Sequence, residues 1–285
     1  PPTFQQILEC LGNHSLTDVG AIYSYLNARM AMSGCTLSSN VASAGVGGAA
    51  IVNDNLSQLT MDQCTVAGNY SSGSGGAINN RTSSSMTVRH CTISSNGTTG
   101  QGGGIFSSSV LQLTNSIICG NSAVGGNANL KNDFGTLNSL DTLIDTNALL
   151  APLGNYGGLT MTLPPMPGSP AIDAGNDTAA AAFPTDQRGE PRLLGAHVEI
   201  GAVEGVFDPN YPLVNVTKLG NGNVQFAFTN LSGPSYRVLA STNVAAPLNT
   251  WSNLGAPTEA PAGTFTFTDL QATNYPQRFY RVTMP

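Results

Sequence analysis

Met86-Thr87-Val88-Arg89-His90-Cys91-Thr92-Ile93-Ser94-Ser95-Asn96, preceded by Gly75-Gly76-Ala77-Ile78, is the clearest of four related segments between residues 20 and 121. The other copies end on Asn40, Asn69 and Asn121, so the asparagines follow one another at steps of 29, 27 and 25 residues. A period of this length is typical of solenoid proteins, in which each repeat forms one coil.

The order of apolar and polar side chains within a copy favours strands over helices. Leu59 and Met61 alternate with Thr60, and Cys64 and Val66 alternate on the opposite parity. Alternation places every second side chain on one face of a strand, and the change of parity indicates a corner. No copy has the i, i+3, i+4 apolar spacing of a solenoid helix. We therefore predict an all-β chain whose repeats form a right-handed parallel β-helix, with three short strands in each triangular coil.

Stacked coils would bring equivalent side chains together at about 4.8 Å, the spacing between neighbouring strands. Three interior aliphatic columns are therefore expected. They comprise Ile22, Ile51, Ile78 and Ile105; Met30, Leu59, Met86 and Leu111; and Leu37, Val66, Ile93 and Ile118. The asparagines that close the copies are expected to form a structural ladder of hydrogen bonds at one corner. These residues are Asn40, Asn69, Asn96 and Asn121.

Three of the five cysteines, Cys35, Cys64 and Cys91, share one repeat position. We predict that they stack inside the solenoid as a structural column of small buried side chains. Their spacing lacks the close CxxC or CxxH pairs of zinc sites, although a disulfide between adjacent coils is geometrically conceivable. Cys10 and Cys119 lie outside this column, and a disulfide that involves Cys10 stays open.

The composition limits the partners and the location of the protein. Only 9% of the residues are charged and the net charge is −6, with no basic run that could neutralise phosphates, so nucleic acid is excluded as a partner. No apolar run approaches the roughly 18 residues of a membrane span. The low share of charged residues suits a secreted β-rich protein, so we expect it to be extracellular or displayed at a cell surface. Because Pro1-Pro2 is neither an initiator nor a signal sequence, we also expect a processed product.

Three regions follow from changes in the sequence texture. Residues 1–149 contain the coils, with a thin N-terminal cap that Phe4, Ile7, Leu8 and Leu11 would form. Residues 150–206 are rich in proline and glycine and are expected to dock on the last coil, tied by Asp173, Asp186 and Arg188. Residues 207–285 contain short alternating strands between turn sequences, which predict a small β-sandwich of fibronectin or immunoglobulin type.

The second region also carries a family resemblance, in segments around Leu150–Leu163, Pro167–Gly175, Thr185–Gly189 and Ile200–Glu204. This signature resembles that of the choice-of-anchor Q family of bacterial surface β-helix proteins, although Tyr156 and Val203 depart from it. The repeats separately resemble those of polymorphic outer membrane proteins, through Gly75-Gly76-Ala77-Ile78 and Ile93-Ser94-Ser95-Asn96. The first resemblance implies an exported protein without a settled enzymatic activity, and the second implies adhesion.

An enzyme or a binding module is the alternative, because parallel β-helices resemble polysaccharide lyases and hydrolases. Asp62 and Arg89 occupy equivalent corners and are expected to pair, and His90 is expected at the same exposed corner without an orienting carboxylate. No two carboxylates share a strand at a spacing suited to glycoside cleavage. Trp251 is a candidate platform for stacking a surface glycan, although a lone tryptophan in a small β-sandwich is more often part of the core.

No cofactor is expected, although a weak calcium site could form from Asp133, Asp141 and Asp145, whose spacing matches no established loop. The sequence thus predicts a structural or adhesive protein without catalysis. Strand edges at the ends of a β-helix can pair with a neighbouring copy, so head-to-tail association into filaments is also expected, with the C-terminal domain as a candidate connector.

Overall fold

The computed structural model describes residues 9–16, 19–45 and 47–284, so the expected cap residues Phe4, Ile7 and Leu8 lie outside the described residues. Within these ranges the chain is built almost entirely of strands and loops. The exceptions are the helix α1 (Asp177–Ala180) and two 3-10 turns at Leu248–Thr250 and Ala272–Asn274. The chain divides into two compact units, Pro1–Gly205 and Val206–Pro285.

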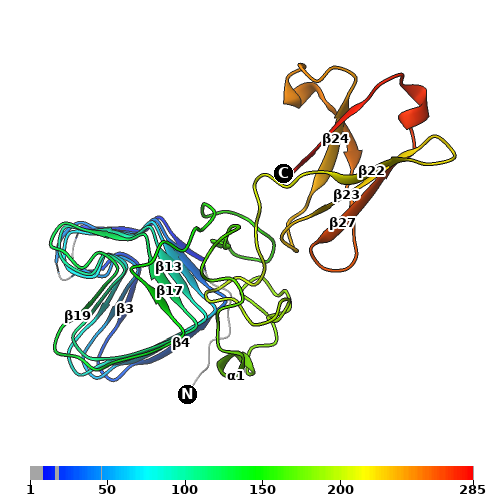
Figure 1. Ribbon diagram of the computed structural model, residues 1–285. Helices are drawn as coiled ribbons and strands as arrows, with labels where there is room; N and C mark the ends of the chain where they lie inside the picture. The colour runs from blue at the N-terminus through cyan, green and yellow to red at the C-terminus, as the bar shows by residue number, and fades with distance from the viewer. Residues whose placement is uncertain (1–8, 17–18, 46, 285) are drawn as a thin grey trace. The chain divides into compact units, whose positions relative to one another are not determined.

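The first unit confirms the predicted parallel β-solenoid, with about five turns (Figure 1). Its strands form four parallel sheets, named A to D. Sheet A contains β1 (Glu9–Leu11), β5 (Thr36–Ser38), β9 (Thr65–Ala67), β13 (Thr92–Ser94), β17 (Ile117–Cys119) and β21 (Leu143–Ile144). Sheet B contains β2 (His14–Ser15), β6 (Val41–Ala42), β10 (Tyr70–Ser71), β14 (Gly97–Thr98) and β18 (Ser122–Ala123).

The other two sheets complete each coil. Sheet C contains β3 (Ile22–Ser24), β7 (Ile51–Asn53), β11 (Ile78–Asn80), β15 (Ile105–Ser107) and β19 (Leu130–Asn132). Sheet D contains the longest strands, β4 (Arg29–Ser33), β8 (Gln58–Asp62), β12 (Ser85–Arg89), β16 (Val110–Thr114) and β20 (Leu137–Leu140).

A coil therefore has four strands, and the prediction of three was wrong. The additional strand is the two-residue member of sheet B, which follows each corner asparagine. Two residues are too few for an alternating pattern to be visible in the sequence, so Tyr70 and Ser71, for example, read as part of a loop.

The three aliphatic columns lie in the expected register. In sheet D, Met86 pairs with Leu59 on one side and with Leu111 on the other, and all three are at most 1% exposed. Burying a large aliphatic side chain contributes about 1.5–3 kcal/mol, so these columns hold the coils together. Further members extend the columns at both ends. They are Cys10, Leu130, Leu137 and Ile144.

Glycine-rich loops cover the outer side of sheet C by stacking coil on coil. A Cβ atom added at Gly47, where φ is 93°, would overlap the carbonyl oxygen of Ser74, and one added at Gly76 would overlap a carbonyl of the following loop. This close backbone approach explains the adjacent glycines before β7, β11 and β15. The same loops bury the outward side chains Val52 and Asn79.

Residues 146–205 form an irregular segment, here called the flank, which includes α1 and lies beside sheet A (Figure 1). Its contacts extend along the side of the solenoid, from Glu9 of β1, which accepts the backbone N–H of Met161 at 3.1 Å, to Leu143 of β21. The expectation that it docks on the last coil was therefore incomplete, because the flank contacts that coil at Asp141 and Leu143 but lies against the earlier coils as well. The inner strands of sheet A are buried on both faces because the flank covers them.

The second unit consists of two antiparallel sheets. Sheet E contains β22 (Val214–Lys218), β23 (Val224–Thr229), β27 (Thr264–Asp269) and β26 (Thr258–Glu259). Sheet F contains β25 (Ser252–Gly255), β24 (Arg237–Ser241) and β28 (Phe279–Thr283). Both contribute to one core, in which Phe228 and Phe265 stack at a centroid distance of 4.8 Å. The hydroxyl of buried Tyr236 donates a hydrogen bond to the carbonyl of Leu231 at 3.0 Å.

Candidate functional site

The corner asparagines lie in one continuous ladder between sheets A and B. The side-chain amide of each donates to the Oδ1 atom of the next, at 2.8 to 3.0 Å. The ladder runs through Asn13, Asn40, Asn69, Asn96, Asn121 and Asn129. Sequence reasoning missed Asn13 and Asn129, and the latter breaks the period because it follows Asn121 by eight residues. Asn129 donates to the carboxylate of Asp145 at 2.8 Å, a strong acceptor that terminates the ladder.

Cys35, Cys64 and Cys91 are buried in one column inside the solenoid and form no disulfide. The backbone N–H of Cys64 lies 3.3 Å from Cys91 Sγ, and Ser116 continues the column by accepting from the N–H of Cys91 at 3.1 Å. Burial raises the pKa of the Cys64 thiol well above its usual range, so it is a poor nucleophile. Cys10, for which a disulfide was left open, is also a free thiol.

A threonine column on the outer face of sheet A anchors the flank. Thr36, Thr65 and Thr92 are neighbours in register and all are buried. Gln187 bridges the first two, because its Nε2 donates to Thr36 Oγ1 at 2.9 Å and its Oε1 accepts from Thr65 Oγ1 at 2.6 Å. Thr92 Oγ1 accepts the backbone N–H of Ala202 at 3.1 Å. The repeated Cys-Thr dipeptide was the available signal for this column, and sequence reasoning used only its cysteine.

The flank contains a buried ionic cluster behind this contact. The side chains of Asp186 and Arg188 have no exposed surface and form an ion pair at 2.8 Å. The Arg188 guanidinium also donates to the carbonyl of Glu204 at 2.7 Å. A buried ion pair is tolerated only where its remaining polar atoms are bonded, so this pair fixes the course of the chain. Asp173, the third predicted tie, instead accepts the backbone N–H of Ala196 at 2.7 Å.

Three further buried residues, Arg192, Glu199 and Glu204, complete the cluster. Glu204 Oε2 lies 4.0 Å from a guanidinium nitrogen of Arg192 and accepts the backbone N–H of Glu199 at 3.0 Å. Burial, followed by the interaction with Glu199, raises the pKa of Glu204 to about 9.

His90 contradicts the expectation of an exposed corner, because its side chain is completely buried. Phe183 of the flank packs edge-on against the imidazole at a centroid distance of 4.9 Å, and the Nε2 atom lies 3.5 Å from Asn115 Nδ2. Burial, and then the charge of Arg192, lower the pKa of His90 to about 3, so the ring is neutral at pH 7. The repeat pattern gave no information on the flank that covers this corner.

Sheet D has an open outer face, since many outward side chains of β4, β8, β12 and β16 are exposed or half-buried. Asp62 is the one outward carboxylate on these strands, and Arg89 of the next coil binds it through Nε and Nη2, both at 2.7 Å. This is the pairing expected from the sequence. Glycoside cleavage generally requires two carboxyl groups about 5–9.5 Å apart, which these strands do not provide.

The three aspartates considered for calcium each have a separate partner. Asp133 lies 3.6 Å from the ammonium of Lys131, Asp141 accepts from the amide of Asn176 at 3.0 Å, and Asp145 terminates the asparagine ladder. Among residues 9–16, 19–45 and 47–284, no three His, Cys, Asp or Glu side chains are grouped so that they could hold a metal ion.

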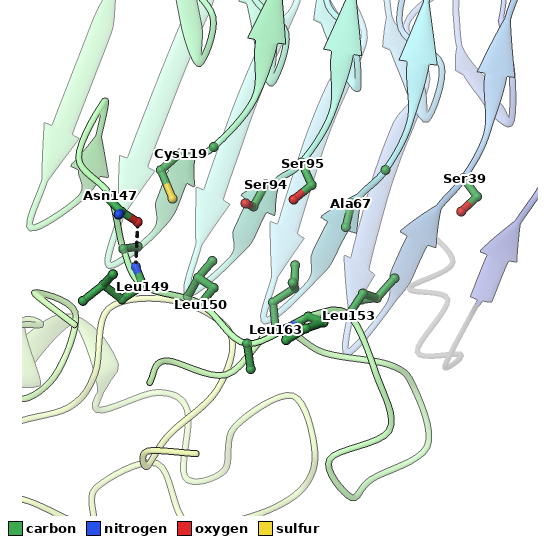
Figure 2. A pocket seen from close by; sticks show the side chains of 15 residues that line it. Ser39, Ala67, Ser94, Ser95, Cys119, Asn147, Leu149, Leu150, Leu153 and Leu163 are labelled. Carbon is green, nitrogen blue, oxygen red and sulfur yellow. Dashed lines mark hydrogen bonds between the residues drawn. The ribbon is translucent and has the colours of Figure 1, made fainter. Parts of the chain in front are cut away.

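A groove of about 460 Å³ lies between the flank and the corners that follow sheet A (Figure 2). Small residues line one side of the groove and leucines line the other. They include Ser39, Ala67, Ser94, Ser95 and Cys119 on the solenoid, and Leu149, Leu150, Leu153 and Leu163 on the flank. Burial raises the pKa of the Cys119 thiol, and the lining residues include no histidine or carboxylate. The groove therefore lacks an acid–base pair.

The last coil, formed by β18 to β21, is open on its outer side. Within the described residues, no strand pairs with β18, β19, β20 or β21 beyond the preceding coil. Leu137 belongs to an interior column but is 36% exposed, whereas its neighbour Leu111 is fully buried. Phe134, just before β20, is 99% exposed and Leu140 is 48% exposed. Unpaired backbone groups and apolar side chains thus lie together at this end.

Trp251, the candidate sugar platform, is half-buried in the second unit. Its indole N–H donates to the carbonyl of Ala246 at 3.0 Å, so the polar atom of the ring is already bonded. No helix in the described part of the chain is both long and apolar enough to cross a membrane.

Comparison with known proteins gave no match. No family model matches the chain, and neither a curated protein nor a solved structure is detectably similar to it. The fold alone therefore defines the class, which is an all-β protein with a parallel β-solenoid, a lateral flank and a separate antiparallel unit.

Proposed function

We propose that the chain is a structural or adhesive protein without catalytic activity that acts outside the cell or at its surface. Its charge-poor composition and its resemblance to choice-of-anchor Q proteins and polymorphic outer membrane proteins support this assignment. The ionic contacts within the flank support it as well, because the hydrogen bonds of the Asp186 and Arg188 side chains are made within the fold and stabilise it.

The finer fold assignment belongs to the same proposal. A right-handed solenoid agrees with the usual chirality of crossover connections between parallel strands. A β-sandwich of fibronectin or immunoglobulin type is supported by the common core of sheets E and F. The bond from the Tyr236 hydroxyl to a carbonyl five residues upstream also resembles the tyrosine corner of such sandwiches.

The open last coil supports a specific role for the protein, namely head-to-tail association with a second copy of the chain. The unpaired edges of four strands, one from each sheet, lie at this end. A partner that matches all four edges is another coil of the same geometry. Parallel pairing requires strands that run in the same direction, so the first coil of a second copy, β1 to β4, is the complementary surface. In this arrangement Leu137 would be covered by the equivalent column member Met30. A contact of this kind does not close on itself and gives filaments.

Sedimentation and electron microscopy of the full chain test this role. We expect oligomers or filaments that grow with concentration, and we expect Leu137→Lys to return the protein to monomers because it places a charge in the junction. Leu159→Lys is the matched control, since Leu159 is 75% exposed on the flank and lies outside the last coil. Monomers at every concentration, or equal effects of the two variants, would contradict the proposal.

A polysaccharide lyase or hydrolase is the alternative function, and the open face of sheet D is the observation that favours it. Depolymerase assays on neutral and acidic glycans distinguish the two. Turnover that is abolished by Asp62→Asn, with the fold intact, would replace the non-catalytic proposal.

A further inference from the structure

Two tyrosines form an exposed aromatic pair at the corner between sheets C and D. Tyr23 lies on β3 and Tyr25 follows it directly, with ring centroids 5.4 Å apart and planes tilted by 45°. The two residues are 48% and 50% exposed, and the adjacent Leu26 is 63% exposed. A cluster of large apolar groups in water is characteristic of a surface that binds a partner.

Polar groups surround this pair in a fixed arrangement. The Tyr23 hydroxyl donates to Asp54 Oδ2 at 3.1 Å, and Arg81 Nη1 donates to the same oxygen at 3.0 Å. Asp54 Oδ1 accepts the backbone N–H of Asn55 at 2.8 Å, which holds the carboxylate in place. The Arg81 side chain remains 38% exposed, so it presents guanidinium N–H groups to solvent beside the rings.

The coils supply the rigidity that such a site needs. Strand β3 pairs with β7, and β7 pairs with β11, in continuous register. Tyr25, Asp54 and Arg81 each come directly after a strand of sheet C, so they occupy the same corner on three successive coils. A surface that is already ordered loses little conformational entropy when it binds a ligand.

The chemistry of the corner selects the ligand. An aromatic face beside fixed hydrogen-bonding groups suits a ring that is apolar on its face and polar around its edge, as sugars and nucleobases are. The net charge of −6 opposes a nucleic acid, and the ion pair of Asp54 with Arg81 neutralises the local charge. We propose that Tyr23, Tyr25, Asp54 and Arg81 form a binding site for an uncharged carbohydrate chain.

In this site the tyrosine rings stack on sugar faces, and the guanidinium of Arg81 donates to sugar hydroxyls. The site is separate from Trp251, which lies in the second unit. Tyr23 and Tyr25 belong to the first coil, which we also assign to the junction with a second copy, so sugar binding has to be measured at a concentration at which the chain is monomeric or in the Leu137→Lys variant. The two proposals keep separate readouts, because Leu137→Lys alters the last coil and leaves Tyr23 and Tyr25 unchanged, so failure of either proposal leaves the other standing.

Calorimetric titration of the full chain with cellohexaose, maltohexaose and xylohexaose tests the site. We expect at least one of these neutral oligosaccharides to bind, and Tyr25→Ala to weaken its binding by about tenfold through loss of the stacking surface. Tyr25→Phe keeps the ring and should stay within about twofold of the parent chain. Tyr70→Ala is the matched control, because Tyr70 is 46% exposed on β10, in sheet B.

Circular dichroism would first establish that each variant is folded. Absence of binding to all three oligosaccharides would overturn the proposal, as would equal losses in Tyr25→Ala and Tyr70→Ala. Loss of binding in Trp251→Ala with full binding in Tyr25→Ala would place the sugar site in the second unit. Tighter binding of an oligogalacturonate than of the neutral oligosaccharides would overturn the assignment to an uncharged ligand.

Discussion

Gln187 Oε1 accepts a 2.6 Å hydrogen bond from Thr65 Oγ1, although the two residues are 122 positions apart in the chain. The same side chain donates to Thr36 on the preceding coil and to Thr160 within the flank, both at 2.9 Å. One buried amide therefore joins two coils of sheet A to two parts of the flank. It is one of the contacts that hold the flank beside sheet A, together with the bond of Ala202 to Thr92.

Gln187→Ala should loosen the flank while the solenoid stays intact. The substitution leaves the buried hydroxyls of Thr36 and Thr65 without this partner, at a cost of about 3 kcal/mol. Hydrogen exchange should show faster exchange of the Ala202 amide, which bonds to Thr92. Gln58→Ala, on the open face of sheet D, is the control and should change stability by less than about 0.5 kcal/mol. Unchanged protection of the flank in Gln187→Ala would show that this amide does not hold it.

Val88→Asp should destabilise the solenoid itself. Val88 is fully buried and pairs in register with Met61 and Leu113, so a carboxylate there would lie among apolar side chains. We expect a loss of about 4 kcal/mol in urea unfolding. Thr87→Asp, one residue earlier on the outer face, should cost much less because its side chain reaches solvent. Similar losses in the two variants would mean that the inward and outward assignments of β12 are wrong.

The sequence predicted the interior of the coils because a stacked repeat presents the same apolar position many times. Met86 and Ile93 could be placed from their equivalents in the other copies without any knowledge of loops. The two-residue strands of sheet B escaped prediction because they are shorter than one period of alternation. Asn129 escaped because the spacing of its ladder changes at the last coil.

The flank could be predicted only in part, since its contacts depend on single residues distant in the sequence. Asp186 and Arg188 were recognised as polar ties, but their bonds to one another, to Tyr156 and to Glu204 join parts of the flank, whereas the sequence analysis expected them to hold it on the last coil. Their partners have no periodic signal. The environment of His90 has no periodic signal either. Its side chain is buried because Phe183 of the flank packs against it. The sequence analysis considered the outward-facing residues of the coils only for their charges. It therefore did not identify Tyr23 and Tyr25 as candidate binding residues.

Because the pKa of Glu204 is raised, we predict that the stability of the fold declines as the pH rises from weakly acidic to alkaline values. Its pKa is about 9 in the folded protein, against a usual value of 4.5, so between these values the folded state binds the extra proton. The contribution is complete below pH 4.5 and is lost as the pH approaches 9. Melting temperatures measured from pH 5 to 9 should therefore fall, and Glu204→Gln, which is neutral throughout, should flatten this decline. An equal slope in the variant would assign the effect to other groups.

The lowered pKa of His90 leads to the opposite prediction at acidic pH, namely that the stability of the fold decreases as the pH falls. Its pKa is about 3 in the folded protein, against a usual value of 6.5, because the ring is buried and faces the positive charges of Arg192 and Arg89. Between these two values the unfolded chain binds the additional proton, so this contribution is complete above pH 6.5 and is lost as the pH falls towards 3.

His90→Gln should therefore flatten the loss of stability on acidification, even though it lowers stability at pH 7 by removing the packing of the ring against Phe183. His14→Gln is the control, since the ring of His14 is exposed and bonds only to Ser43 among the described residues. Unfolding followed from pH 3 to 7 in the parent chain and both variants distinguishes the two sites. An acid limb as steep in His90→Gln as in the parent chain would show that the buried carboxylates, and not the imidazole, govern acid unfolding.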